Sequence, residues 1–210
     1  MKAHPISMLF VLVFALSACT SNTKEASKTK SNIQNGDIIF QTSLSSQSKA
    51  IQLATNSKYS HCGIIFIENN QPFVFEAVQP VKKTSLNVWI NSGERSHYVI
   101  KRLKNADKLL NNVVLNKMKT EGYKFAGKNY DFAFGWSDDR IYCSELVWKI
   151  YKRALGIELG KTQKLKEFNL NNAIVRKKLE ERYKGNIPYE EIVISPAAIF
   201  ESDYLETVKQ

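Results

Sequence analysis

Short apolar runs rich in β-branched and aromatic residues recur along the chain and predict strands at 37–40, 61–67, 72–78, 97–103 and 192–194. Between them, apolar residues spaced three and four positions apart predict helices at 46–55, 107–120, 143–155 and 172–183. Ser195-Pro196 opens a last short helix. Because strands and helices are mixed along the chain, we expect an α+β fold.

The runs 61–67 and 72–78 flank Glu68-Asn69-Asn70-Gln71 and predict a β-hairpin. A two-residue turn at Asn69-Asn70 and a four-residue loop give the same register. Both place Gly63 opposite Glu76 and leave His61 diagonal to Glu76 on one face, about 7–8 Å away along the backbone. A three- or five-residue turn would instead move Glu76 to the other face. With the expected register, the side chains of His61 and Glu76 can touch.

The helix predicted after Tyr142 has an apolar face and clear ends. Lys152 and Arg153 occupy its last turn, Gly156 is a natural stop, and Asp138 or Asp139 is a candidate N-cap. Its apolar positions are Leu146, Val147, Ile150, Ala154 and Leu155. This spacing places Cys143 in the first turn, on the face directed toward the body of the domain.

Cys143, His61 and Glu76 together suggest nucleophilic catalysis. A helix N-terminus stabilises a thiolate, an imidazole can take the thiol proton, and a carboxylate can orient the imidazole. Each residue also has a structural interpretation, because a buried cysteine is commonly an inert small hydrophobe, a strand histidine is commonly structural, and Glu76 could face solvent. The three residue types, with two of them brought to one face by the hairpin, favour a catalytic triad.

Two further segments carry expectations about packing. The helix at 107–120 should end near Gly122 and direct five apolar side chains inward: Leu109, Leu110, Val113, Val114 and Met118. The segment 123–136 is rich in aromatic residues and glycine, and it precedes the candidate nucleophile. It could line a substrate groove or form a packed loop that covers the core.

The N-terminal residues predict export. Lys2 and His4 precede an apolar stretch at 8–16 that is too short to span a bilayer and ends in Ser17-Ala18-Cys19. Leu16 to Cys19 resembles a bacterial lipobox, in which cleavage before the cysteine leaves it lipidated, although ordinary cleavage after Ala18 is the alternative. We therefore expect a signal peptide at 1–18, a polar flexible tether at 19–35 and one catalytic domain at 36–210. The lipid would anchor the protein to a membrane.

Cysteine usage and charge narrow the function classes. Cys62 follows His61 on the predicted strand and should project from the opposite face, which argues against a disulfide with Cys143 and against a zinc site. No metal or cofactor is expected. The net charge of +10 would suit nucleic acid, but export removes that partner and leaves anionic lipids or acidic envelope polymers. The basic side of the helix at 172–183 is most simply a solvated face.

Four segments resemble the circularly permuted papain-like amidases of the YiiX/YaeF-like type, which are related to the NlpC-type cell-wall peptidases. The segments are Gly36 to Phe40, Ser57 to Ile64, Phe75 to Val81 and Tyr142 to Val147, and the resemblance covers most of 36–200. It implies a small antiparallel barrel or sheet packed against helices, with Cys143 as nucleophile, His61 as base and Glu76 as orienting acid. Tyr142 matches the tyrosine before the nucleophile and is expected to help bind substrate or the oxyanion. Cys62 departs from the small aliphatic residue usual at its position.

The resemblance and the predicted export together imply a thiol hydrolase tethered in a bacterial cell envelope, facing the periplasm. Its expected substrate is a peptide or amide bond, in peptidoglycan first of all, cleaved through a thioester. A lipid-directed acyltransferase or esterase with the same cysteine is the first alternative. A non-catalytic envelope-binding lipoprotein is the second.

Overall fold

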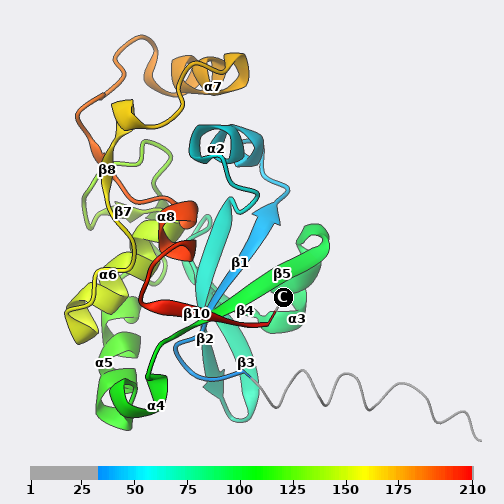
Figure 1. Cartoon of the computed structure of the whole chain (residues 1–210), viewed down its shortest axis with the longest axis vertical. Helices are drawn as coiled ribbons and strands as arrows, with labels where there is room; N and C mark the ends of the chain where they lie inside the picture. Colours follow the sequence, from blue (N-terminus) through cyan, green and yellow to red (C-terminus); the bar gives the residue numbers. More distant parts are fainter. Residues whose placement is uncertain (1–32, 210) are drawn as a thin grey trace, which may run out of the picture. The chain divides into compact units, whose positions relative to one another are not determined.

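A six-stranded antiparallel sheet forms the centre of the computed structural model, which describes residues 33–209 (Figure 1). Its strands lie in the order β10, β5, β1, β2, β3, β4. Their bounds are β1 Ile38–Ser43, β2 His61–Glu68, β3 Gln71–Glu76, β4 Lys82–Ser85, β5 Gly93–Leu103 and β10 Leu205–Lys209. The predicted α+β class with an antiparallel sheet against helices is therefore confirmed, and the sheet is open rather than closed into a barrel.

Helices cover both faces of this sheet. On one face α5 (Asn112–Tyr123) packs beside α6 (Cys143–Leu155), and α6 packs on β2. On the other face α3 (Leu86–Asn91) contributes the fully buried Trp89 to a second apolar cluster. The remaining helices are α2 (Ser48–Thr55), α4 (Ala106–Leu109), α7 (Ala173–Tyr183) and α8 (Pro196–Phe200), and α2 packs against α7. Two-residue strands pair as β6 (Asn129–Tyr130) with β7 (Arg140–Ile141) and as β8 (Gln163–Lys164) with β9 (Ile192–Val193).

The hairpin of β2 and β3 has the predicted register. Ile64 faces Phe75 and Glu68 faces Gln71, so the turn consists of Asn69 and Asn70. Both asparagines have positive φ, 49° and 60°, which is the backbone of a two-residue type I′ turn. Asparagine tolerates this left-handed conformation better than most residues, and this explains why the turn forms here.

Helix α6 begins at Cys143, as predicted, and ends at Gly156 in the left-handed conformation with φ of 78°. The predicted N-cap was wrong. Tyr142 holds that position, and Glu145 accepts a hydrogen bond from its backbone N–H at 3.4 Å. Asp138 instead forms ion pairs with Lys149 and Arg153, farther along the helix.

The helix predicted at 107–120 is broken into α4 and α5, because Asn111 caps α5 by accepting a hydrogen bond from the backbone N–H of Val114. The break changes which side chains point inward. Met118 is buried, as predicted, but Leu109 is 41% exposed and Val113 is 78% exposed, so their predicted inward orientation was wrong.

The folded unit begins earlier than the predicted start at Gly36. Ile33 is buried in the second apolar cluster, and Asn35 accepts a hydrogen bond from the backbone N–H of Ile67 at 2.7 Å. The predicted signal peptide, Cys19 and most of the tether lie outside the described residues. Within 33–209, the structure contains no helix with the length and apolar character needed to cross a membrane.

Candidate active site

His61 and Glu76 touch, as the hairpin register predicted. His61 is the first residue of β2 and Glu76 is the last of β3, and the imidazole Nε2 lies 2.6 Å from the carboxylate Oε2. Both residues are buried, with 8% and 5% of their surface exposed. Because Nε2 is held by Glu76, Nδ1 is the ring nitrogen left to exchange a proton with a nucleophile.

Glu76 also accepts hydrogen bonds from two residues that follow it in the chain. The Thr84 hydroxyl donates to Oε1 at 2.6 Å, and the Trp89 indole Nε1–H donates to Oε2 at 2.8 Å. Burial raises the pKa of Glu76, but the hydrogen bonds and the charge of His61 outweigh burial, so the net shift is downward. The carboxylate is therefore held ionised and fixed at both oxygens.

Cys143 completes this group. It is 2% exposed, and its thiol lies close enough to His61 for each group to shift the pKa of the other. A hydrogen bond from the Cys62 thiol, opposed by burial and reinforced by His61, holds the pKa of Cys143 well below its usual range. Burial lowers the pKa of His61, but hydrogen bonds and charges from Cys143 and Glu76 prevail and raise it to about 10. The arrangement favours a thiolate and imidazolium pair beside a carboxylate.

Cys62 lies where the sequence argument did not expect it. Its thiol was predicted to project away from the site, but it contacts Cys143, and both cysteines are free thiols. Burial, followed by the contact with Cys143, raises the pKa of Cys62 well above its usual range, so Cys62 stays protonated and donates. Alternation along a strand fixes only the Cβ directions. Helix α6 packs on β2, and His61 is the first residue of that strand. The side chains of His61 and Cys62, which leave β2 on opposite faces, can therefore both approach the sulfur of Cys143.

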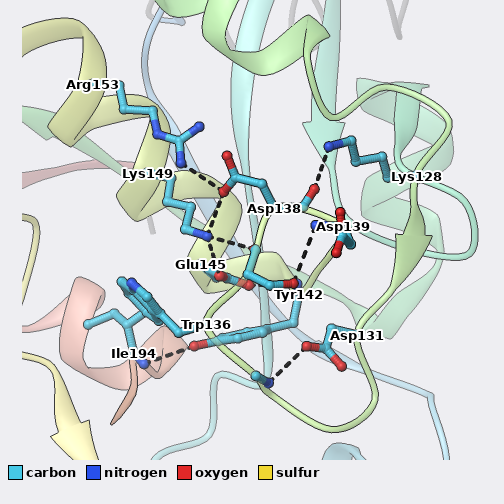
Figure 2. A network of polar contacts seen from close by, with 12 residues as sticks. Lys128, Asp131, Trp136, Asp138, Asp139, Tyr142, Glu145, Lys149, Arg153 and Ile194 are labelled. Atoms are coloured by element: carbon cyan, nitrogen blue, oxygen red, sulfur yellow. Dashed lines mark hydrogen bonds and ion pairs between the residues drawn. The ribbon is translucent and has the colours of Figure 1, made fainter. Parts of the chain in front are cut away.

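Tyr142, which is expected to help bind substrate or the oxyanion, lines the cavity that reaches Cys143. Its hydroxyl accepts a hydrogen bond from the backbone N–H of Ile194 at 3.1 Å, and the residue is 1% exposed (Figure 2). Burial raises its pKa well above the usual value, so the hydroxyl stays neutral. The side chain thus ties the start of α6 to the segment before α8. Its hydroxyl has a partner within the fold, and its part in substrate or oxyanion binding stays a prediction.

A buried ion-pair network holds the same end of α6, as Figure 2 shows. Lys149 lies 2.7 Å from Glu145 Oε1 and 2.9 Å from Asp138 Oδ1, and it donates to the backbone oxygen of Ser137. Burial, only partly offset by Lys149, raises the pKa of Glu145 to about 7. These contacts fasten the loop that precedes the nucleophile to the helix that carries it.

Tyr130 is the site residue that the sequence argument did not single out. It lines the same cavity as Cys143, and its hydroxyl accepts a hydrogen bond from Gln47 Nε2 at 2.9 Å. Gln47 in turn accepts from Arg182 at 2.8 Å. Burial raises the pKa of Tyr130 well above its usual value, so it keeps its proton. Its place in the predicted aromatic segment was the available signal, but that segment gave no reason to prefer it over its neighbours.

Two cavities meet at Gln47 and Tyr130, which line both. The cavity that reaches Cys143 has an empty volume of about 670 Å³, and its wall is mainly apolar, including Ala50, Ile51, Ala54, Val175, Leu179 and Val193. The cavity that reaches His61 and Glu76 has about 1120 Å³ and contains more polar groups, among them Ser43, Ser45, Gln79 and Lys82. Of the aromatic segment, Phe125 is buried in the core and Phe134 lines the first cavity, so its place in a substrate groove stays a prediction.

The chain is similar in sequence and structure to a known protein family. Residues 32–209 match the family described as permuted papain-like amidase enzymes, YaeF/YiiX, C92 family. The chain is 54% identical over 175 residues to the uncharacterized protein YiiX of Escherichia coli strain K12, covering 83% of this chain and 85% of YiiX. It is also similar to a crystal structure described as that of metalloprotein YiiX from Escherichia coli O157:H7. That match has a TM-score of 0.82 and 53% identity, and it covers 85% of this chain and 98% of that one.

The description of that relative raises the question of a metal. Among residues 33–209, no three or more His, Cys, Asp or Glu side chains are grouped so that they could hold a metal ion. At the candidate site itself, the His61 imidazole is held by Glu76 at 2.6 Å and interacts with the Cys143 thiol. Within residues 33–209, these side chains are therefore arranged to move a proton between sulfur, imidazole and carboxylate, and they are not grouped around an ion.

Proposed function

This chain belongs to the permuted papain-like amidases of the YaeF/YiiX, C92 family, and we propose that it hydrolyses amide bonds with Cys143 as nucleophile, His61 as base and Glu76 as the orienting carboxylate. The observation that carries the proposal is the 2.6 Å hydrogen bond between His61 and Glu76, with the Cys143 thiol placed where it interacts with the same imidazole. Within it, the thiol pKa is lowered and the imidazole pKa is raised.

The reaction follows from these groups. The Cys143 thiolate attacks the amide carbonyl carbon and forms a tetrahedral oxyanion. The backbone N–H groups in the first turn of α6 have no partner within the helix, so together with the Tyr130 hydroxyl they are suited to stabilise that charge. The C–N bond then breaks, His61 gives its proton to the departing amine, and a thioester remains on Cys143. Water, deprotonated by His61, attacks the thioester and releases a carboxylic acid and the free thiolate.

We propose peptidoglycan peptides as the first substrate class and the bacterial cell envelope as the location. Support comes from the predicted signal peptide and the lipobox-like Leu16 to Cys19, which would give a lipid-anchored enzyme. Peptidoglycan is the amide-rich polymer within reach of such an anchor.

Acyl transfer or ester hydrolysis on a lipid is the second candidate, and the apolar cavity beside Cys143 favours it. A substrate acyl chain could lie among Ile51, Val175 and Leu179, while the leaving group occupies the more polar cavity next to His61. An amine or alcohol would then replace water as the acceptor of the thioester. A purely binding function is a weaker proposal, because it requires neither an activated thiol nor an imidazole held by a carboxylate.

Mass spectrometry separates these candidates. The protein is incubated with peptidoglycan fragments, long-chain N-acyl amides or lipid esters, quenched in acid, and mapped for thioesters. A thioester on Cys143 is expected from one of these classes, and it should vanish in Cys143→Ala. If every class leaves Cys143 unmodified and uncleaved substrate is recovered, the catalytic proposal is wrong.

A further inference from the structure

Trp89 is a fully buried residue of α3 that contacts both proton-handling members of the candidate triad. Its Nε1–H donates to Glu76 Oε2 at 2.8 Å. Its ring stacks on the imidazole of His61, with ring centroids 5.7 Å apart and an interplanar angle of 25°. No sequence pattern pointed to this residue, because no helix was predicted at 86–91.

Trp89 and His61 share one oxygen of the Glu76 carboxylate. Oε2 is the carboxylate oxygen that binds His61 at 2.6 Å, whereas Oε1 is taken by Thr84. An indole N–H can donate but cannot accept, and its bond to a carboxylate is stronger than its bond to a neutral acid, so Trp89 favours the ionised form of Glu76. In a buried site such a bond is stronger than in water, since solvent does not compete for it.

We propose that Trp89 is a positioning residue that keeps Glu76 ionised and oriented toward His61. The inference rests on the proposed function, in which the imidazolium stabilises the Cys143 thiolate. Without the indole N–H, Glu76 would become easier to protonate, and only His61 and Thr84 would hold its carboxylate in place. The imidazolium would then be held less firmly, and the pKa of Cys143 would rise.

Alkylation by iodoacetamide tests this without knowledge of the substrate. The rate at Cys143 is followed against pH by mass spectrometry on the full chain, and its acid midpoint reports thiolate formation. Trp89→Phe keeps an aromatic ring over His61 and removes only the N–H. Loss of one hydrogen bond to a charged group, transmitted through His61, should raise that midpoint by about one pH unit.

Trp148→Phe is the matched control. Trp148 lies on α6, and its Nε1 has no hydrogen-bond partner among residues 33–209, so the same substitution there should leave the midpoint unchanged. Making Trp89→Phe in a protein that already carries Glu76→Ala supplies a second measurement. If Trp89 acts through Glu76, then Trp89→Phe adds little to Glu76→Ala, because the acceptor is already gone.

The possible outcomes are distinct. A wild-type midpoint near the ordinary thiol pKa would refute the thiolate and imidazolium pair itself. A low wild-type midpoint that Trp89→Phe leaves in place would refute the positioning role alone. A shift of equal size in the Glu76→Ala background would also contradict it, because Trp89 would then act only as packing. If Trp89→Phe fails to fold, Trp89→His replaces it, because the histidine ring can still donate an N–H. Trp89→His should restore both the fold and the low midpoint. A folded Trp89→His with a raised midpoint would overturn the proposal.

Discussion

Gly63→Ala should destabilise the domain and displace the site together. Gly63 lies in β2, and a Cβ built there would be 2.5 Å from Val74 Cγ1, 2.9 Å from the backbone oxygen of Phe75 and 3.3 Å from Glu76 Cβ. The first two distances are shorter than real Cβ contacts allow. A rotation of Val74 could relieve the first, but the Phe75 oxygen belongs to the paired strand and moves only with the backbone.

The expected loss is about 1–3 kcal/mol in the free energy of unfolding, the usual cost of adding a methyl group to a packed core. With the urea dependence typical of small domains, a loss of about 2 kcal/mol lowers the unfolding midpoint by roughly 1 M. Tryptophan fluorescence in a urea titration measures this. Val74→Ala removes the closest obstacle but also truncates a fully buried side chain, so the double variant Gly63→Ala/Val74→Ala should lose less than the sum of the two single losses.

The same substitution should weaken the reactivity of Cys143 even where the protein is fully folded, because separation of β2 from β3 pulls Glu76 away from His61. Iodoacetamide labelling in the absence of urea measures this second effect. An unchanged urea midpoint with unchanged labelling would contradict this prediction, because it would mean that β2 and β3 are not packed as tightly as these distances require.

Four other outcomes follow from the site. His61→Ala should abolish turnover, whereas Glu76→Gln should reduce it by about 10²–10⁴-fold, as in other triads; a fully active Glu76→Gln would remove the orienting role. Tyr130→Phe should lower kcat by about 10²–10³-fold if its hydroxyl stabilises the oxyanion, and unchanged kcat would exclude that. Turnover should fall as pH rises through about 10, because His61 then loses the proton that it gives to the leaving amine; activity that persists unchanged above that pH would argue against this role. Cys19→Ala should move the protein from the membrane to the soluble fraction or block signal cleavage, and an intact mass that shows unmodified Cys19 in the wild type would contradict lipidation.

The local parts of the site could be predicted from sequence. The turn at Asn69-Asn70 sets the register of β2 and β3, and register alone brings His61 to Glu76. The apolar spacing after Cys143 and the stop at Gly156 define α6. Both inferences use only residues that are close in sequence, for which periodicity is a sufficient guide.

The parts that depend on packing between distant segments could not be predicted. Cys62 reaches Cys143 because α6 packs on β2, and strand alternation carries no information about that contact. Trp89 and Thr84 lie in short elements, α3 and β4, whose sequences show little periodicity. The break before α5 depends on the single side chain of Asn111, which competes with the helix for a backbone N–H.

The most direct test of the central claim is the order in which the two described cysteines of the folded protein react with iodoacetamide as pH is raised from acid to neutral. The account predicts that Cys143 is labelled first, far below the ordinary thiol pKa of about 8.5, while Cys62 stays unlabelled, and that His61→Ala abolishes the early labelling. Labelling of Cys62 first, or of Cys143 only near the ordinary thiol pKa, would contradict the claim that Cys143 is an activated nucleophile.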